Sequence, residues 1–489
     1  MKILVIGSGL SAYGACRALI TDKSQSEITV LDVGLKSPYP GQPNQQIFNA
    51  APVNGHFYPY GLNDDRWCVR LDSRRICSSH AFGGFSSVYS GSLMAPSPED
   101  LVDWPMASKP SCNDYDSIAK SLEVIHKNDE LDAAFPQPGH FAQFEYKPRR
   151  NATFSGFSRV AFNQNLQLDS PFNSRLEFEA WANKGLIIYQ PNAYVHSLQS
   201  FNGKVRVNYF CQNNFENYAV FDAVFVGAGC INTTGIIDRS VYTEGTREYN
   251  LCSAPILIQM HLKLLNSPFF NPHRNPVLAR NSELSAVFCE HYLNSAFSWS
   301  HTQLSFLNKT ARSQISKRLP DFLYKILSHF FGRLIFSITV FHSNLGPKSK
   351  VLSSAISPND GSDHKKYQLK ILESSWTPPI KVVRSINFSI LSQFRKLFLI
   401  PLPLTRSVAD MMRGNTLGGW HYGGTLPMSD SPTLPHSVHA DGSVNALRNV
   451  FVIDSSGFPT IPGSSVAFLT MANAHRIAKQ FLEQGIRRF

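Results

Sequence analysis

The sequence predicts an α/β chain in which a dinucleotide-binding domain is interrupted by a second domain built on an antiparallel sheet. Strand–turn–helix patterns occur at both ends of the chain and again near residue 225. The stretch between the pattern near residue 225 and the C-terminal pattern alternates apolar and polar residues, as antiparallel strands do. We therefore expect residues 1–110, 186–254 and 416–489 to form one discontinuous domain. Residues 111–185 and 255–415 would form the other, a substrate or cap domain.

The first strand–turn–helix unit begins at the second residue. Residues 3–6 are apolar and predict a buried parallel strand, which leads into a Gly-x-Gly-x-x-Ala sequence. Gly7 permits a tight turn, and Gly9 lets the backbone approach a pyrophosphate at the N-terminus of the following helix. A second strand ends at Asp32, 20 residues after Ala12, where a carboxylate would accept a hydrogen bond from a ribose hydroxyl. This order favours a dinucleotide site over an empty βα turn, but it does not separate FAD from NAD.

The other two units have the same form. Residues 221–226 predict a strand that leads into a turn with Ala228 and Gly229 and then a helix. Residues 449–453 predict a strand that ends at Asp454, followed by a turn rich in proline and glycine and a helix of small residues. Because ligands bind at the carboxyl ends of parallel strands, we expect the two ends of the chain to build one cofactor site.

The composition narrows the classes of function. The net charge of +11 predicts an anionic partner, which could be a nucleotide, a phosphate-bearing substrate or a membrane surface, or it reflects solubility alone. No nucleic-acid-binding motif accompanies the charge, so we expect no nucleic acid partner. The eight cysteines include no Cys-x-x-Cys pair, so we expect no structural metal and no disulfide framework. A strand at residue 2 leaves no room for a secretory signal, and a cytoplasmic location is expected.

The stretch from 255 to 417 predicts the inserted domain. Residues 283–289 and 296–307 alternate as antiparallel strands do, whereas helices are expected around 310–338 and 384–399. In the segments 321–338 and 384–400, apolar residues recur at helical spacing and basic residues mark the other side. Each segment could lie on the inner face of a membrane with its cations near lipid phosphates. The alternative, which we favour, is that both pack on the sheet of their own domain.

With these units aligned, the chain resembles the glucose–methanol–choline (GMC) family of FAD-dependent oxidoreductases. The resemblance covers about half of the chain and rests on five islands in the family's order. These are the N-terminal fingerprint, a Gly-Gly-x-Ser loop at 83–86, a strand–Ala-Gly–helix element at 226–235, a His-x-x-Gly-Thr-x-x-Met stretch at 421–428, and the tail with Asp454, Phe458 and Pro459. The sequence of the Gly-Gly loop is similar to that of a bacterial branch of the family, which is associated with surface-polysaccharide and lipid-linked sugar pathways.

The resemblance implies a Rossmann-like FAD-binding domain with an inserted antiparallel-sheet substrate domain, the GMC and p-hydroxybenzoate-hydroxylase type of fold. Some members link FAD to a histidine at the position that Val88 holds here, so the resemblance implies non-covalent FAD. The residues that it assigns to FAD are Gly7, Gly9, Leu10, Ala12, Asp32, Gly83, Gly84, Ser86, Ser87, Val195, Ala228, Gly229, Asp454, Phe458 and Pro459.

The resemblance also implies a reaction. FAD would take a hydride from the carbon of an alcohol, and His421 would act as acid and base, since the pKa of histidine lies near working pH. Ser465 stands where the family has a second His or Asn, so we expect it to be a hydrogen-bonding partner. A sugar-like alcohol, nucleotide- or lipid-linked sugars included, is the expected substrate, and the electron acceptor is open. The alternatives are a sterol-like or long-chain lipid alcohol, and a flavin-binding scaffold without turnover.

Overall fold

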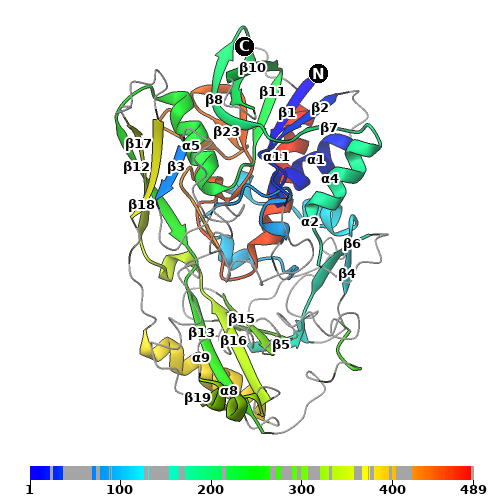
Figure 1. Ribbon diagram of the computed structural model, residues 1–489, viewed down its shortest axis with the longest axis vertical. Coiled ribbons are helices and arrows are strands. Elements are labelled where there is room, and N and C mark those ends of the chain that lie inside the picture. Colours follow the sequence, from blue (N-terminus) through cyan, green and yellow to red (C-terminus); the bar gives the residue numbers. More distant parts are fainter. Residues whose placement is uncertain are drawn as a thin grey trace.

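A computed structural model describes most of the chain, which is drawn in Figure 1. The described residues are 1–21, 26–36, 69–72, 78–87, 89, 91–125, 130–131, 153–164, 171–211, 216–264, 271, 273–276, 289–294, 299–306, 320–329, 333–356, 366–372, 374, 379–395, 399–402 and 421–485. Some residues with sequence-based predictions lie outside these ranges, namely Val88, residues 310–319 and residues 403–420.

An eight-stranded sheet joins the two ends of the chain. Five of its strands are parallel neighbours, in the order β7 (Ile188–Gln190), β2 (Glu27–Leu31), β1 (Lys2–Ile6), β11 (Ala223–Val226) and β24 (Leu447–Val452). Three short strands complete the sheet, namely β23 (Ser443–Val444), β22 (Val438–His439) and β21 (Met428–Ser429). The strands of all three predicted units therefore lie side by side.

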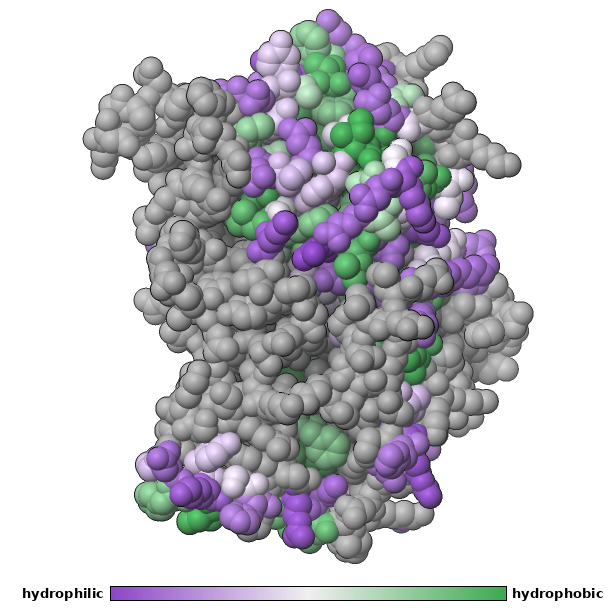
Figure 2. Space-filling view, turned by 45° about the vertical axis from the view of Figure 1, so that its right-hand side comes forward, coloured by the Kyte–Doolittle hydropathy of each residue, from purple (hydrophilic) through white to green (hydrophobic). Residues whose placement is uncertain are grey.

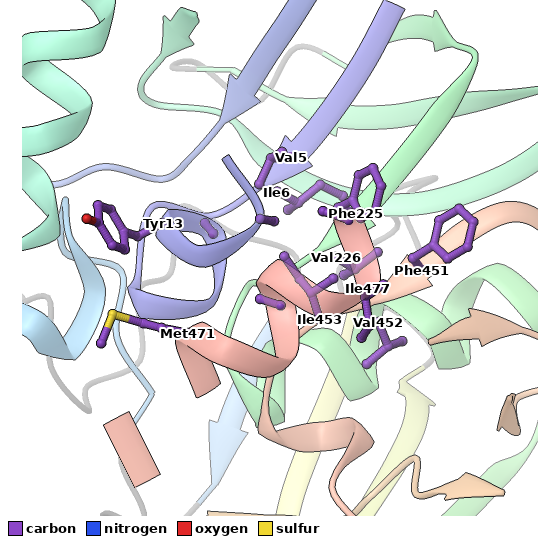
Figure 3. Packing of buried hydrophobic residues seen from close by; sticks show 14 of the residues in the cluster. Val5, Ile6, Tyr13, Phe225, Val226, Phe451, Val452, Ile453, Met471 and Ile477 are labelled. Carbon is purple, nitrogen blue, oxygen red and sulfur yellow. The ribbon is translucent and has the colours of Figure 1, made fainter. Parts of the chain in front are cut away.

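Helices from opposite ends of the chain pack together beside this sheet. Helix α1 (Leu10–Thr21) lies against α11 (Val466–Gln484), and Figure 3 shows the two helices next to the labelled buried residues of β1, β11 and β24. The approach is close because Gly14 has no side chain: a Cβ there would lie 2.2 Å from the carbonyl oxygen of Met471. This packing fixes the C-terminal helix next to the first glycine turn.

Smaller sheets and helices surround the parallel sheet. One antiparallel sheet contains β8 (Tyr194–Phe201), β9 (Lys204–Phe210) and β10 (Glu216–Phe221), and a two-stranded one contains β4 (Leu122–Ile125) and β6 (Val160–Asn163). A five-stranded sheet has the order β20 (Tyr422–Gly423), β12 (Thr246–Ser253), β17 (Ser349–Ile356), β18 (Lys366–Leu372) and β3 (Val69–Asp72). The remaining helical elements near them are α2 (Cys112–Ala119), α4 (Ser174–Asn183), α5 (Cys230–Val241), η1 (Gly84–Ser87), η2 (Pro98–Leu101), η3 (Met106–Ser108), η7 (Ser343–Leu345) and η10 (Ser455–Gly457).

A six-stranded antiparallel sheet forms the other end of the molecule (Figure 1). Its strand order is β19 (Leu399–Leu402), β13 (Ile256–Lys263), β16 (Leu334–Val340), β15 (Trp299–Phe306), β14 (Cys289–Asn294) and β5 (Thr153–Phe157). Helix α9 (Ile380–Gln393) packs on one face through Ile386 and Ile390, which contact Leu304 and Ile335. Helix α8 (Asp321–Ser328) packs on the opposite face, where its Tyr324 lies against Leu334 and Phe336.

Two helix predictions in this region are correct only in part. Within 310–338 only α8 is helical among the described residues, and 334–340 form the central strand β16. The segment 384–400 holds the end of α9, but its last two residues begin the edge strand β19. A short apolar run fits a buried strand as well as a helix, and the β-branched residues Ile335, Ile338 and Val340 favour the strand. Pro401 is tolerated because β19 is an edge strand.

The strand predicted at 296–307 is confirmed as β15. Of the strand predicted at 283–289, only Cys289, the first residue of β14, lies among the described residues, so that prediction stays untested. The predicted fold class is confirmed: a Rossmann-like parallel sheet is combined with a six-stranded antiparallel sheet. Five strands of the antiparallel sheet lie between the second and third units of the sequence, whereas β5 comes from before the second unit. The exact domain boundaries stay a prediction.

Candidate cofactor site and its neighbouring histidine

A cleft opens at the carboxyl ends of the parallel strands, where all three predicted glycine turns meet. Ten of the residues that were predicted to bind the cofactor line it: Gly7, Gly9, Leu10, Asp32, Gly84, Ser86, Val195, Ala228, Gly229 and Asp454. They come from segments that are far apart in the sequence, and the N-terminus of α11 contributes Val466 to the same cleft. The expectation that both ends of the chain build one cleft is therefore met.

The glycine turns approach one another backbone to backbone. Gly7 has a φ of +97°, and a Cβ at this residue would lie 2.5 Å from the carbonyl oxygen of Gly227. Gly84 has a φ of +57°, and its Cβ would lie 3.1 Å from the Cα of Gly9. A side chain at either position would be strained and would fill the floor of the cleft. The turns thus form a cradle open to a phosphate group, which the N-terminus of α1 would stabilise.

Asp32 lies at the end of β2 inside the cleft and is held by two hydroxyl groups. The Ser8 hydroxyl and the Tyr189 hydroxyl, the latter at 3.0 Å, both donate to its Oδ2 atom. Ser8 in turn accepts a hydrogen bond of 2.9 Å from the Gly83 N–H, so the Gly-Gly loop is tied to Asp32. Burial raises the pKa of Asp32 to about 6, and hydrogen bonds from Ser8 and Tyr189 oppose that rise. Ser8 occupies a variable position of the fingerprint, so no sequence signal pointed to it.

Asp454 connects the C-terminal strand to the first turn of α5. Its Oδ2 accepts hydrogen bonds from the Gly229 N–H at 2.9 Å and the Thr233 hydroxyl at 2.5 Å. Its Oδ1 accepts from the N–H and the hydroxyl of Ser456, at 3.0 and 2.5 Å. Burial raises the pKa of this carboxyl, and these bonds oppose the rise. Asp454 therefore fixes the turn at Gly229 on one side of the cleft.

Five residues predicted to bind FAD do not line the cleft. Ala12 is buried in the core beneath it. Gly83 and Ser87 support the Gly-Gly loop through hydrogen bonds to Ser8 and to the Phe82 carbonyl. Phe458 is fully buried against Trp104, with ring centroids 4.8 Å apart, and Pro459 follows it. The lining also includes residues that were not predicted to bind the cofactor, among them Ser8, His80, Tyr194, Asn232, Tyr422, Ser455, Val466 and Thr470.

His421 is not among the residues that line this cleft, but it directly precedes Tyr422, which does line it. The carbonyl oxygen of His421 accepts a 2.9 Å hydrogen bond from the Ala254 N–H, which fixes its backbone where β12 leads into β13. Burial, together with the nearby His301, lowers the pKa of His421 to about 4. Its Nδ1 atom is buried and has no hydrogen-bond partner among the described residues. The imidazole is therefore neutral near pH 7 and can accept a proton.

Ser465 is buried, and its hydroxyl donates a 3.0 Å hydrogen bond to the carbonyl oxygen of Ser92. The hydroxyl hydrogen is thus used within the protein, and Ser465 keeps only acceptor capacity for a ligand. The neighbouring Ser464 is also buried, and its hydroxyl has no partner among the described residues.

His301 is the functional candidate that the sequence did not reveal. It lies on β15 opposite Tyr292 of β14, and the two rings stack with centroids 4.3 Å apart. Alternation along the strands directs His301 away from the face that α9 covers. Two residues earlier, the Trp299 carbonyl oxygen lies where a Cβ of Gly463 would be, so β15 supports the turn before Ser464. The strand itself was predicted, but its position beside His421 depends on strand pairing.

Comparisons with known proteins identify a family for part of the chain and solved structures with a similar fold. Residues 390–474 match the family model of the GMC oxidoreductases, specifically their C-terminal domain. The chain therefore carries a GMC oxidoreductase C-terminal domain, which includes His421, Asp454 and Ser465. No curated protein sequence matches the chain.

Two solved structures resemble the whole chain. Pyridoxine 4-oxidase from Mesorbium loti has 13% sequence identity and a TM-score of 0.60, and 99% of each chain is covered. An FAD-dependent oxidoreductase from Chaetomium thermophilum, solved in complex with a small fragment, has 14% identity, a TM-score of 0.58 and the same coverage. At such low identity the likeness establishes the fold. Because GMC oxidoreductases are FAD-dependent flavoproteins, the family match confirms the predicted cofactor, FAD.

Proposed function

We propose that this protein is an FAD-dependent oxidoreductase that oxidises the CH–OH group of an alcohol to an aldehyde or ketone. The observation that carries the proposal is the position of His421. It is a neutral, half-buried histidine whose buried Nδ1 atom has no hydrogen-bond partner among the described residues, and it directly precedes a residue that lines the predicted cofactor cleft. A group of this kind is suited to remove the hydroxyl proton of a substrate.

The residues of the cleft fit FAD. The glycine cradle would hold the pyrophosphate, Asp32 would accept hydrogen bonds from the ribose, and the backbone of Val195 would lie near the adenine. When bound, FAD supplies the acceptor for the hydride at flavin N5. Val88 lies outside the described residues, so non-covalent binding stays a prediction from the sequence.

His421 would act on the substrate oxygen. In its neutral form it accepts the hydroxyl proton, which allows the carbon–hydrogen bond to break with its electron pair. The resulting imidazolium returns the proton to solvent in the second half of the cycle. Ser465 would act as a hydrogen-bond acceptor or as a support of the turn, because its hydrogen bond to Ser92 fixes its hydroxyl.

For the substrate we propose a sugar-like alcohol, with nucleotide- and lipid-linked sugars as the first candidates. The net charge of +11 supports a substrate that carries phosphate. A second candidate function is a flavin-binding scaffold without turnover. It is supported by the turn after Asp454, which offers the serine hydroxyls of Ser464 and Ser465 and no second titratable group.

The test is to mix the flavin-loaded protein with a panel of alcohols under anaerobic conditions. Sugars, nucleotide sugars, sterols and long-chain alcohols are compared by the loss of the visible flavin absorbance. Bleaching by sugars alone supports the proposal, whereas bleaching by sterols or long-chain alcohols alone would replace the sugar substrate with a lipid alcohol. A flavin that stays oxidised with every class would favour the scaffold.

A further inference from the structure

We propose that Ser464, rather than Ser465, is the second side chain that holds the substrate oxygen, together with His421. The assignment depends on the proposed function, the oxidation of an alcohol. The Ser464 hydroxyl would donate a hydrogen bond to the same oxygen whose proton His421 accepts. Sequence spacing pointed to Ser465, and only the contacts of the two serines tell them apart.

The hydroxyl group of Ser464 is buried and unused. Only 1% of this residue is exposed, and its Oγ atom has no hydrogen-bond partner in the part of the chain that the structure describes. A serine at the surface would find water, and hydrophilic residues do lie at the surface beside apolar ones at both ends of the molecule (Figure 2). A buried hydroxyl without a partner lowers stability, so it is expected where a ligand or an ordered water uses it.

The neighbouring Ser465 is already committed to the protein. Its hydroxyl donates the 3.0 Å hydrogen bond to the carbonyl oxygen of Ser92. Its backbone is extended, with φ of −62° and ψ of 126°, where it begins helix α11. Because consecutive side chains of an extended segment point to opposite sides, the side chain of Ser464 points away from Ser92. The single hydroxyl hydrogen of Ser465 is therefore taken, whereas that of Ser464 is available to a ligand.

The chain segments that carry Ser464 and His421 pack directly on each other. Ile461, three residues before Ser464, is fully buried. A Cβ at Gly423, two residues after His421, would lie 2.8 Å from the Cδ1 atom of Ile461. Each of the two segments also reaches the cofactor cleft within two residues of the polar group that it carries. Both groups are therefore held beside the same end of the cleft.

Strand β15 lies against both segments. The carbonyl oxygen of Trp299 would be 2.2 Å from a Cβ of Gly463, which directly precedes Ser464. Burial, together with His301 two residues further along β15, lowers the pKa of His421, so the two histidines are neighbours. The same short strand thus borders the turn of Ser464 at one residue and His421 at another.

The two groups complement a single alcohol oxygen. The Nδ1 atom of His421 accepts the O–H proton, and the Ser464 hydroxyl donates a hydrogen bond to the oxygen that loses it. As the O–H bond breaks, negative charge grows on this oxygen and strengthens the bond from Ser464. The C–H bond then breaks, its electron pair leaves as a hydride for flavin N5, and a C=O double bond forms. Because the contact is strongest in the transition state, Ser464 would increase the rate more than the affinity.

The experiment is anaerobic stopped-flow reduction of the full-length, FAD-loaded protein. The probes are glucose, UDP-glucose, cholesterol and decanol, and the one that bleaches the parent flavin fastest is used for the variants. Lipid alcohols are included because contact of the segments 321–338 and 384–400 with a membrane stays a prediction. Within the described part of the chain, no helix combines the length and apolar character needed to cross a bilayer.

Ser464→Ala should slow flavin reduction at saturating probe about 10- to 100-fold, while the half-saturating concentration stays within about threefold. Ser158→Ala is the matched control. The hydroxyl of Ser158 is also buried without a partner among the described residues, but Ser158 lies between β5 and β6 and does not line the cleft. Its variant should reduce the flavin within about twofold of the parent rate, since no substrate contact is lost.

Thermal melting separates a substrate contact from a structural role. Ser464→Ala deletes a buried hydroxyl that has no partner among the described residues, so the melting temperature should stay the same or rise. Ser465→Ala deletes the hydrogen bond to Ser92 and should lower the melting temperature. The two neighbouring serines are thus expected to respond in different directions.

Reduction of the Ser464→Ala flavin at the parent rate would overturn the assignment of Ser464 and leave the proposed function standing. A melting temperature that falls as far in Ser464→Ala as in Ser465→Ala would also overturn it, because the hydroxyl would then have a partner inside the protein. An equal loss of rate in Ser158→Ala would show that the effect is not specific to the site. A parent flavin that none of the probes bleaches would instead refute the oxidation itself, and the substrate contact with it.

Discussion

The connection that Asp454 makes between the C-terminal strand and α5 can be tested by replacing it with asparagine. The asparagine amide oxygen can accept the two hydrogen bonds that one of the carboxylate oxygens accepts now. The NH₂ group then takes the place of the other oxygen and faces the backbone N–H of either Gly229 or Ser456. One buried N–H loses its acceptor, and the remaining bonds lose the assistance of a charge. With about 1–3 kcal/mol for each unsatisfied or weakened bond to a charged group, we expect a total cost of about 2–4 kcal/mol.

Asp441 provides a matched control. Its Oδ1 accepts hydrogen bonds from the N–H and hydroxyl of Ser443 at 3.0 and 2.6 Å, as Asp454 does with Ser456. Both of these bonds stay within its own turn, and Asp441 does not line the cleft. We expect Asp454→Asn to raise the dissociation constant of FAD at least ~10-fold, since 1.4 kcal/mol is one factor of ten, and Asp441→Asn to leave it within about twofold. Titration of FAD into the apoprotein by fluorescence measures both. Equal effects of the two variants would refute the assignment of Asp454 to the cofactor cleft.

Three further predictions concern the titrating groups of the site. His421→Ala should slow flavin reduction by an identified alcohol about 10²–10⁴-fold in stopped-flow absorbance while FAD stays bound, and undiminished reduction would remove His421 from the mechanism. His301→Phe should raise the pKa of His421 above about 4, which NMR of the ring protons would measure. The rise should be partial because burial is the larger cause of the low pKa. An unchanged pKa would contradict the proximity of the two histidines. Because a protonated Asp32 accepts hydrogen bonds poorly, the affinity for FAD should fall as pH drops through about 6. The Asp32→Asn variant should bind FAD more weakly and without this pH dependence. The same pH profile in both proteins would exclude Asp32 as its source.

Much of the parallel domain could be predicted from the sequence because its signals are local. A strand followed by a glycine turn and a helix lies within about 15 residues, and the positive φ of Gly7 and Gly229 explains why glycine stands there. The carboxyl ends of parallel strands meet at one edge, so Asp32 and Asp454 could be placed in one cleft without knowledge of the strand order.

The antiparallel domain was harder because its signals are not local. The apolar pattern from Leu334 to Val340 fits a helix and a buried strand equally well. Only the pairing of this segment with β13 and β15 decides in favour of the strand. The neighbourhood of His421 and His301 has the same origin, since it follows from contacts between residues more than 100 positions apart. Ser8 and Ser92 act through a hydroxyl and a backbone carbonyl, for which the sequence carries no pattern.

We propose that both ends of the chain build one FAD site and that His421 accepts a proton from an alcohol there. The most direct test is the visible absorption spectrum of the purified protein, recorded before and after anaerobic addition of candidate alcohols, together with the flavin released on denaturation. We predict about one FAD per chain, free in the supernatant, with a double absorption band that at least one alcohol bleaches. Protein that contains no flavin and cannot be reconstituted with FAD would contradict the account.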